Sequence, residues 1–306
     1  MAGDARICDD LTLADDAEWQ AMRHVSRRGF GLGAAGLVAG GALTGCMATG
    51  ASNAAPIPMP RGLAIIERAV TIATPDGNAD AFFAYPAKGR HAAVLIWPDI
   101  LGLRDSFKDK ARQLARAGYV ALAVNHYYRS AKAPVLPAGA SFMDPATRAA
   151  VAPMGKVLSP TTYASDGKAF VAWLDRQAQV DTKRKIGTVG HCMTGGATIR
   201  AAAASARIGV AASMHGGGLV TDAPDSPHRL IGSTTAALLI AIAQNDDARE
   251  PGTKTGLRET CDAADQTCDI EVYPANHGWT VADSPAYDAA QAERALQRQL
   301  ALYAKL

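Results

Sequence analysis

The chain has 306 residues, of which 48% are hydrophobic and 20% are charged, so its composition is that of a globular protein and not of a disordered one. Lys and Arg number 31 against 29 Asp and Glu, and the resulting net charge of +2 gives no support to nucleic-acid binding, which needs a basic face. Five cysteines are too few for a disulfide scaffold, and they form no cluster with zinc-ligand spacing.

The first 46 residues have the pattern of an export signal. Ser26-Arg27-Arg28-Gly29-Phe30-Gly31-Leu32 matches a twin-arginine motif, and residues 33–42 form a weakly apolar stretch that is too short to span a bilayer as a stable helix. Leu43-Thr44-Gly45-Cys46 then matches a lipobox, which makes Cys46 a lipidation candidate. We therefore expect export to the periplasm by the twin-arginine route, with residues 47–64 as a flexible tether behind the candidate anchor.

From residue 65 to the end, apolar β-rich runs alternate with longer helical patterns. An antiparallel hairpin is expected first, formed by Glu67–Thr74 and Ala79–Tyr85 around a turn at residues 75–78. Further strands are predicted at Ala92–Trp97, Val120–Asn125, Lys185–Gly190, Ile208–Ser213, Ala236–Ala243 and Ile270–Tyr273. Helices are predicted at Ser106–Ala117, Tyr163–Gln177, Met193–Ala206 and Ser284–Tyr303, the last with Ser284 as its cap.

This alternation predicts a single α/β domain over residues 65–306. It should hold a doubly wound, mostly parallel sheet with an N-terminal antiparallel hairpin and helices on both faces. Residues 130–160 contain several Pro and show no clear period, which indicates a cap loop over the site.

The cysteines within this domain fall into a pair and a single residue. Cys261 and Cys268 lie seven residues apart, which predicts a local disulfide in an oxidising compartment, although two free thiols remain an alternative. Cys8 belongs to the export signal, so Cys192 is the one thiol left without a role.

Cys192 lies in a glycine-rich turn. Gly190-His191-Cys192-Met193-Thr194-Gly195-Gly196 follows a predicted buried strand and opens a predicted helix, which is the sequence context of a nucleophile elbow. Small neighbours let the strand and the helix approach closely there, and the positive end of the helix dipole favours a reactive thiolate. The alternative is a structural Cys in a glycine-rich turn.

Two further side chains follow the ends of predicted strands. Asp246 comes after the strand that ends at Ala243, and His277 lies in a small-residue loop after Tyr273. The order nucleophile, acid, base is that of an α/β hydrolase, and open α/β sheets place their sites at these strand ends. Asp247 competes with Asp246 for the role of the acid, and His215 is a weaker alternative to His277 as the base.

Together these motifs resemble the dienelactone hydrolase family, across roughly residues 65–306. The resemblance implies an α/β-hydrolase fold in which Cys192 is the nucleophile, His277 the general base and Asp246 its orienting acid, with no metal or organic cofactor. The oxyanion hole would then be formed by the backbone N–H groups of Met193 and Ile100.

Three further positions are candidates for substrate binding or for control of the thiol's reactivity. By the same resemblance, Asp99 stands where the family holds a Glu beside the resting thiol, and Arg129 matches a carboxylate-binding Arg. A second family Arg, expected shortly after the catalytic His, is absent from His277-Gly278-Trp279-Thr280-Val281. Trp279 could instead line an apolar substrate pocket, together with Trp97 and Phe142.

The sequence thus predicts a monomeric hydrolase of small carboxylic esters or lactones that works through a thioester acyl-enzyme, with no nucleic-acid partner. A hydrolase of another substrate class, such as a peptide, stays open. The alternative from another class is a non-catalytic exported lipoprotein that uses the fold as a ligand-binding or interaction module. A thiol redox or acyl-carrying role is disfavoured because no second Cys lies near the elbow in the sequence.

Overall fold

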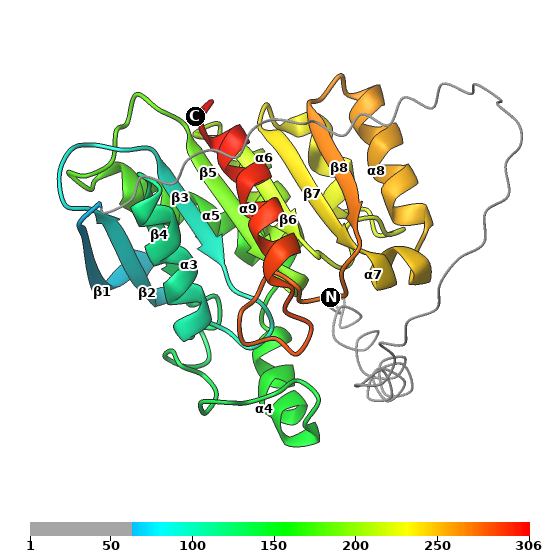
Figure 1. The fold of residues 1–306 in the computed structure, drawn as a ribbon, viewed down its shortest axis with the longest axis horizontal. Coiled ribbons are helices and arrows are strands. Elements are labelled where there is room, and N and C mark those ends of the chain that lie inside the picture. Colours follow the sequence, from blue (N-terminus) through cyan, green and yellow to red (C-terminus); the bar gives the residue numbers. More distant parts are fainter. Residues whose placement is uncertain (1–62) are drawn as a thin grey trace, which may run out of the picture. The chain divides into compact units, whose positions relative to one another are not determined.

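An eight-stranded sheet forms the centre of the protein (Figure 1). The computed structural model describes residues 63–306, so the predicted export signal, Cys46 and almost all of the tether lie outside the described residues. The strands are β1 (Ile65–Thr74), β2 (Gly77–Pro86), β3 (Ala93–Trp97), β4 (Val120–Val124), β5 (Ile186–His191), β6 (Ile208–Met214), β7 (Ala237–Ala243) and β8 (Cys268–Tyr273). All eight were predicted, to within two residues at every end.

The strand order in the sheet is β1-β2-β4-β3-β5-β6-β7-β8. The pairs β1–β2 and β2–β4 are antiparallel, and every other neighbouring pair is parallel. The predicted mostly parallel, doubly wound sheet with an N-terminal hairpin is therefore confirmed. Because the parallel strands all run the same way, the loops that follow β3, β5, β6, β7 and β8 gather at one edge of the sheet.

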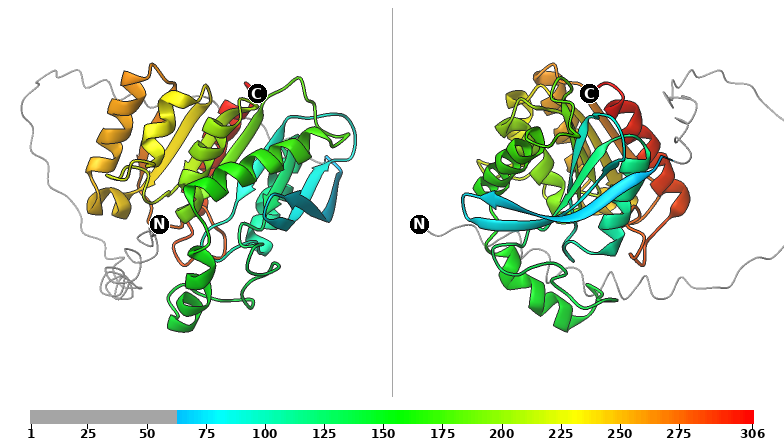
Figure 2. Two further views of the ribbon diagram at one scale, coloured as in Figure 1. Left: turned by 180° about the vertical axis from the view of Figure 1, so that it is seen from behind. Right: turned by 90° about the vertical axis from the view of Figure 1, so that its left-hand side faces the viewer.

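Helices cover both faces of the sheet (Figures 1 and 2). The helices α3 (Asp105–Arg116) and α9 (Ala289–Tyr303) pack on one face, and α5 (Pro160–Asp175), α6 (Gly195–Ala204) and α8 (Gly252–Ala263) pack on the other. Successive residues of a strand point to opposite faces, so Leu95 belongs to the α5/α6/α8 core and Ile96 to the α3/α9 core. This double burial explains why the central strands are apolar at nearly every position.

Three helices were not predicted. They are α4 (Pro145–Gly155), α7 (Gln244–Arg249) and α8, and they bury few side chains: Thr147 and Val151 in α4, none in α7, and Leu257 and Cys261 in α8. Helix α4 lies in the segment predicted to be a cap loop, and Figure 1 shows it projecting from the edge of the sheet where α7 begins. A disulfide joins Cys261 of α8 to Cys268 of β8.

The last helix begins later than predicted. Its first residue is Ala289, and the side chain of Asp288 caps it by accepting a hydrogen bond from the backbone N–H of Gln291 at 3.0 Å. The prediction of Ser284 as the cap is therefore wrong, and residues 274–288 form a loop behind β8. None of the helices within residues 63–306 is long and apolar enough to cross a membrane.

Candidate active site

Cys192 lies on a strained turn between β5 and α6. Its φ is +57°, which is unusual for a residue with a side chain, and it opens the short 3₁₀ segment η1 (Cys192–Thr194). A Cβ on Gly195 would lie 2.4 Å from Ser213 Oγ and 2.6 Å from the Cα of Gly216, so only glycine fits there. These close approaches are the structural reason for the glycine-rich sequence, and they hold the half-buried free thiol at the edge of the sheet.

His277 is brought to this thiol by the loop after β8. Its Nδ1 lies 2.6 Å from Asp246 Oδ2, and the same ring is hydrogen-bonded to the side chain of Cys192. Burial by itself lowers the pKa of His277, but the negative charges of Cys192 and Asp246 outweigh it and raise the pKa well above its ordinary value. The structure thus brings together the three side chains that the sequence placed after three separate strands.

The neighbouring aspartates have different partners. Asp247 Oδ2 accepts a hydrogen bond from Lys254 Nζ at 2.7 Å, whereas Asp246 faces His277 and also Arg249 Nη2 at 3.0 Å. The backbone N–H of His277 donates to Asn245 Oδ1 at 2.8 Å, which fixes the histidine loop against the loop after β7. Of the two carboxylates left open by the sequence, the geometry pairs Asp246 with the imidazole.

His215 supports the backbone of the elbow. The backbone N–H of Cys192 donates to His215 Nδ1 at 3.1 Å, and His215 Nε2 lies 3.0 Å from Thr280 Oγ1. Burial, and then the positive charge of His277, lower the pKa of His215 well below its ordinary value, so the ring is neutral. With both ring nitrogens engaged, His215 positions the nucleophile's turn, and it does not occupy the place of a base beside the sulfur.

Two buried hydroxyls connect the elbow to the loop after β3. Tyr127 Oη lies 3.0 Å from the carbonyl oxygen of Ile100 and 3.3 Å from Met193 Sδ. Thr194 Oγ1 lies 3.0 Å from the carbonyl oxygen of Trp97 and 2.9 Å from that of Pro98. These contacts hold together the two segments whose backbone amides were predicted to form the oxyanion hole. Sequence reasoning missed both anchors, because a Tyr and a Thr carry no motif of their own.

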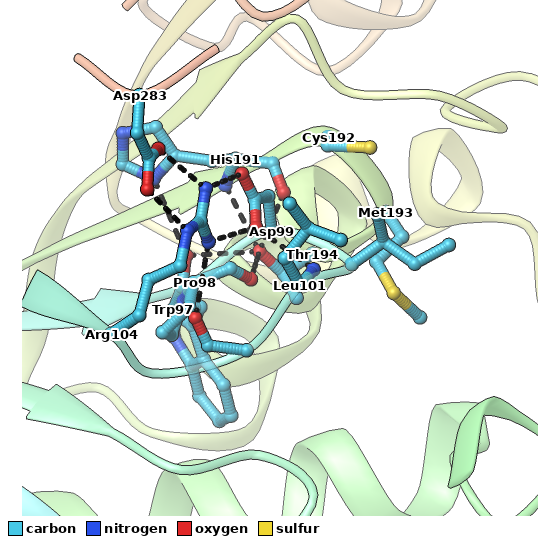
Figure 3. A network of polar contacts seen from close by, with 12 residues as sticks. Trp97, Pro98, Asp99, Leu101, Arg104, His191, Cys192, Met193, Thr194 and Asp283 are labelled. Atoms are coloured by element: carbon cyan, nitrogen blue, oxygen red, sulfur yellow. Dashed lines mark hydrogen bonds and ion pairs between the residues drawn. The ribbon is translucent and has the colours of Figure 1, made fainter. Parts of the chain in front are cut away.

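Asp99 is bound to an arginine. Arg104 donates to both carboxylate oxygens, at 2.6 and 3.0 Å, and then reaches Asp283 with two more hydrogen bonds of 2.7 and 2.8 Å. Figure 3 shows this network, with the Cys192 sulfur pointing away from it. The structure therefore differs from the prediction that Asp99 lies against the resting thiol: the shorter acid is held by a guanidinium five residues along its own loop.

Arg129 is bound to carboxylates of the protein itself. Its guanidinium donates to both oxygens of Asp166, at 2.7 and 2.8 Å, and to Asp76 at 2.6 and 3.0 Å. Asp166 is buried, so this pair is shielded from water. The predicted carboxylate-binding role for Arg129 is therefore not what this geometry shows, because two carboxylates of the protein itself neutralise the cation.

Of the three aromatic residues predicted to line a substrate pocket, two are buried in the core and one is partly exposed. Trp279 is fully buried, where it stacks on Tyr273 at a centroid distance of 5.1 Å and meets His215 edge-on at 5.2 Å. Trp97 is fully buried as well, and its indole N–H donates to Thr188. Both rings therefore belong to the core instead of a substrate pocket, whereas Phe142, in the segment that leads to α4, is partly exposed. Residues 63–306 contain no group of three or more His, Cys, Asp or Glu that could hold a metal ion.

An eight-stranded, mostly parallel sheet with an elbow after β5, flanked by helices on both faces, defines an α/β hydrolase. The comparison with known families is more specific. The model of the dienelactone hydrolase family matches residues 79–306, and the chain belongs to this family.

Relatives and solved structures agree with this assignment. A protein of Methylorubrum extorquens named as a carboxymethylenebutenolidase is 29% identical over 240 residues, which cover 76% of this chain and 79% of that protein. One from Escherichia coli K12 with the same name is 26% identical over 78% of this chain and 86% of its own. A crystal structure named as a dienelactone hydrolase from Klebsiella pneumoniae superimposes with a TM-score of 0.69 at 24% identity, covering 79% of this chain and all of that one. The protein is thus a hydrolase of the dienelactone hydrolase type.

Proposed function

We propose that the protein hydrolyses carboxylic esters or lactones with Cys192 as nucleophile, His277 as general base and acid, and Asp246 as the group that orients His277. The observation that carries this proposal is the double engagement of His277, whose ring is bonded to Asp246 at 2.6 Å and to Cys192 at once. An imidazole held between a carboxylate and a thiol on a strained elbow is the arrangement that nucleophilic acyl transfer requires.

The chemical steps follow from these contacts. His277 takes the proton of Cys192, and the sulfur attacks the carbonyl carbon. The electron pair of the C=O bond moves to an oxyanion facing the backbone N–H groups of Met193 and Ile100. Collapse of this intermediate breaks the C–O bond of the ester, and the departing alkoxide takes a proton from His277. Water then gives a proton to His277 and attacks the thioester, which releases the carboxylic acid and restores the thiol and imidazole pair.

The charges around the site favour an uncharged substrate. A substrate with a free carboxylate needs an unpaired cation, and Arg129 is already paired with Asp166 and Asp76, to which four of its five N–H groups donate. Arg104 is likewise bound by Asp99 and Asp283. We therefore propose neutral esters or lactones as the substrate class, in preference to a dienelactone that carries a free carboxylate.

Hydrolysis of 4-nitrophenyl acetate by the purified protein tests the mechanism. Wild type should form an acetyl thioester on Cys192, visible by mass spectrometry of the intact protein, and Cys192→Ala should lose at least about 10³-fold in kcat/KM because the nucleophile is gone. The thermal unfolding temperature of Cys192→Ala should stay close to that of wild type, which separates loss of chemistry from loss of fold. Full turnover by Cys192→Ala would refute the proposal.

A further inference from the structure

A cavity of about 350 Å³ opens between α3 and α9, on the face of the sheet below the elbow. Its floor is formed by side chains of β3, β5 and β6, including Val189 and Met214, and its walls come from the two helices. None of Cys192, His277 and Asp246 lines it, so it is separate from the candidate active site. Its size is within the range of sites that take small organic molecules, about 300–1,000 Å³.

Two hydrogen-bonding groups in this cavity have capacity to spare. Lys110 Nζ donates to the carbonyl oxygen of Thr280 at 2.5 Å, which within residues 63–306 is the one hydrogen bond of an ammonium group with three donors. Ser106 Oγ is buried without a hydrogen-bond partner among the described residues. Unsatisfied polar groups at such depth are costly, so a ligand that bonds to them gains from their presence.

The charge balance at this place favours an anion. Burial lowers the pKa of Lys110 to about 8, although Asp99 and Asp283 act to raise it, and the charge of Arg104 lowers it further. Both acids are themselves bound to Arg104. At neutral pH Lys110 is thus a cation without a carboxylate of its own. The acids at the rim of the cavity have partners elsewhere: Asp109 pairs with Arg112, and Glu293 accepts a hydrogen bond from Gln297.

We propose that this cavity is a second ligand site, for a small organic carboxylate with an apolar body. The carboxylate would accept hydrogen bonds from Lys110 and Ser106, and the apolar body would pack against aliphatic walls formed by Leu114, Val189 and Leu296. The aliphatic walls favour such a molecule over inorganic phosphate or sulfate, which have no apolar surface to bury.

Hydrogen bonds connect this site to the nucleophile. Lys110 bonds the carbonyl oxygen of Thr280, Thr280 Oγ1 bonds His215 Nε2, and His215 Nδ1 accepts from the backbone N–H of Cys192. A ligand that moves Lys110 therefore acts on the turn that carries the thiol. The coupling should therefore change the reactivity of Cys192, and it is tested separately from the binding.

Calorimetric titration of benzoate into the purified protein tests the binding without any reference to hydrolysis. Benzoate should bind to wild type, and its affinity should fall at least tenfold in Lys110→Met, which keeps the length of the side chain and removes its charge. Lys108→Met, on the same helix but outside the cavity, is the matched control and should bind as wild type does. Ala292→Phe, which fills the cavity from α9, should also abolish binding.

Two results would overturn the proposal. One is equal affinity of wild type and Lys110→Met, and the other is unchanged affinity in Ala292→Phe, because the ligand would then lie outside the cavity. Benzamide, which is neutral and of the same shape, should bind at least tenfold more weakly than benzoate. The rate of Cys192 alkylation should change at saturating benzoate in wild type and stay constant in Lys110→Met; a constant rate in both would refute the coupling.

Discussion

Asp246, and not the adjacent Asp247, orients the imidazole of His277. Asp246 and Asp247 are adjacent in the first turn of α7, and their side chains leave the helix in different directions. Asp246 reaches His277, and Asp247 reaches Lys254 in α8. Two side chains of identical chemistry thus have different roles because the helix turns by about 100° per residue.

We predict that Asp246→Asn and Asp247→Asn differ sharply in activity. Asp246→Asn removes the charge that holds the His277 tautomer, so kcat for ester hydrolysis should fall on the order of 10³-fold. Asp247→Asn should keep the kcat of wild type and lose some stability, because the ion pair with Lys254 is removed. Steady-state kinetics with 4-nitrophenyl acetate measures both; the reverse order of effects would assign the acid to Asp247.

Residues that follow strand ends could be predicted from the sequence, and residues that act through distant partners could not. Cys192 comes directly after β5, Asp246 three residues after β7 and His277 four residues after β8, and each of these strands could be predicted from the sequence. Arg129 and Asp99 also occupy expected places, but their functions depend on partners that the pattern does not reveal. Asp166 lies 37 residues beyond Arg129, and Asp283 lies 179 residues beyond Arg104, so no local motif joins them.

At the scale of elements, burial determines what the sequence reveals. Strands β3, β4 and β5 are buried at every residue, which makes them unmistakable as apolar runs. Helix α7 buries no side chain and α8 buries only Leu257 and Cys261, so neither shows a broad apolar stripe in the sequence, and both were missed. The true start of α9 depends on a single side-chain cap at Asp288, and Ser284-Pro285 has the pattern of such a start four residues earlier.

The packing of the elbow against β6 yields a second prediction. Gly195→Ala should abolish ester hydrolysis and lower the unfolding temperature, because its Cβ would lie 2.4 Å from Ser213 Oγ and 2.6 Å from Gly216 Cα. Gly217→Ala, in the loop after β6, is the matched control. Its Cβ would meet nothing within 4 Å, so activity and stability should be retained. Thermal unfolding and kcat on the two purified variants check this, and an active, stable Gly195→Ala would contradict the close packing.

At the scale of the whole molecule, buried neutral histidines set the response to acid. Burial lowers the pKa of His126 to about 3, and burial also lowers the pKa values of His191 and His215 well below the ordinary value of 6.5. The unfolded chain binds a proton at each of these residues below about pH 6.5, and the folded protein does not. The free energy of unfolding therefore falls as the pH drops from 6.5. His277, whose pKa is raised, is protonated in both states over this range and adds no dependence there.

His126→Leu should make the protein less sensitive to acid. His126 is fully buried, and both of its ring nitrogens lack hydrogen-bond partners among the described residues, so an apolar side chain of similar size breaks no bond. Below pH 6.5 the free energy of unfolding of this variant should fall less steeply than that of wild type, by about 1.4 kcal/mol per pH unit, which is the contribution of one proton. Urea unfolding at pH 8, 6 and 5 measures the two slopes, and the difference between the proteins should stop growing above pH 7. Parallel curves for the two proteins down to pH 5 would mean that His126 takes up its proton in the folded state, and the acid response would then have to come from His191 and His215 alone.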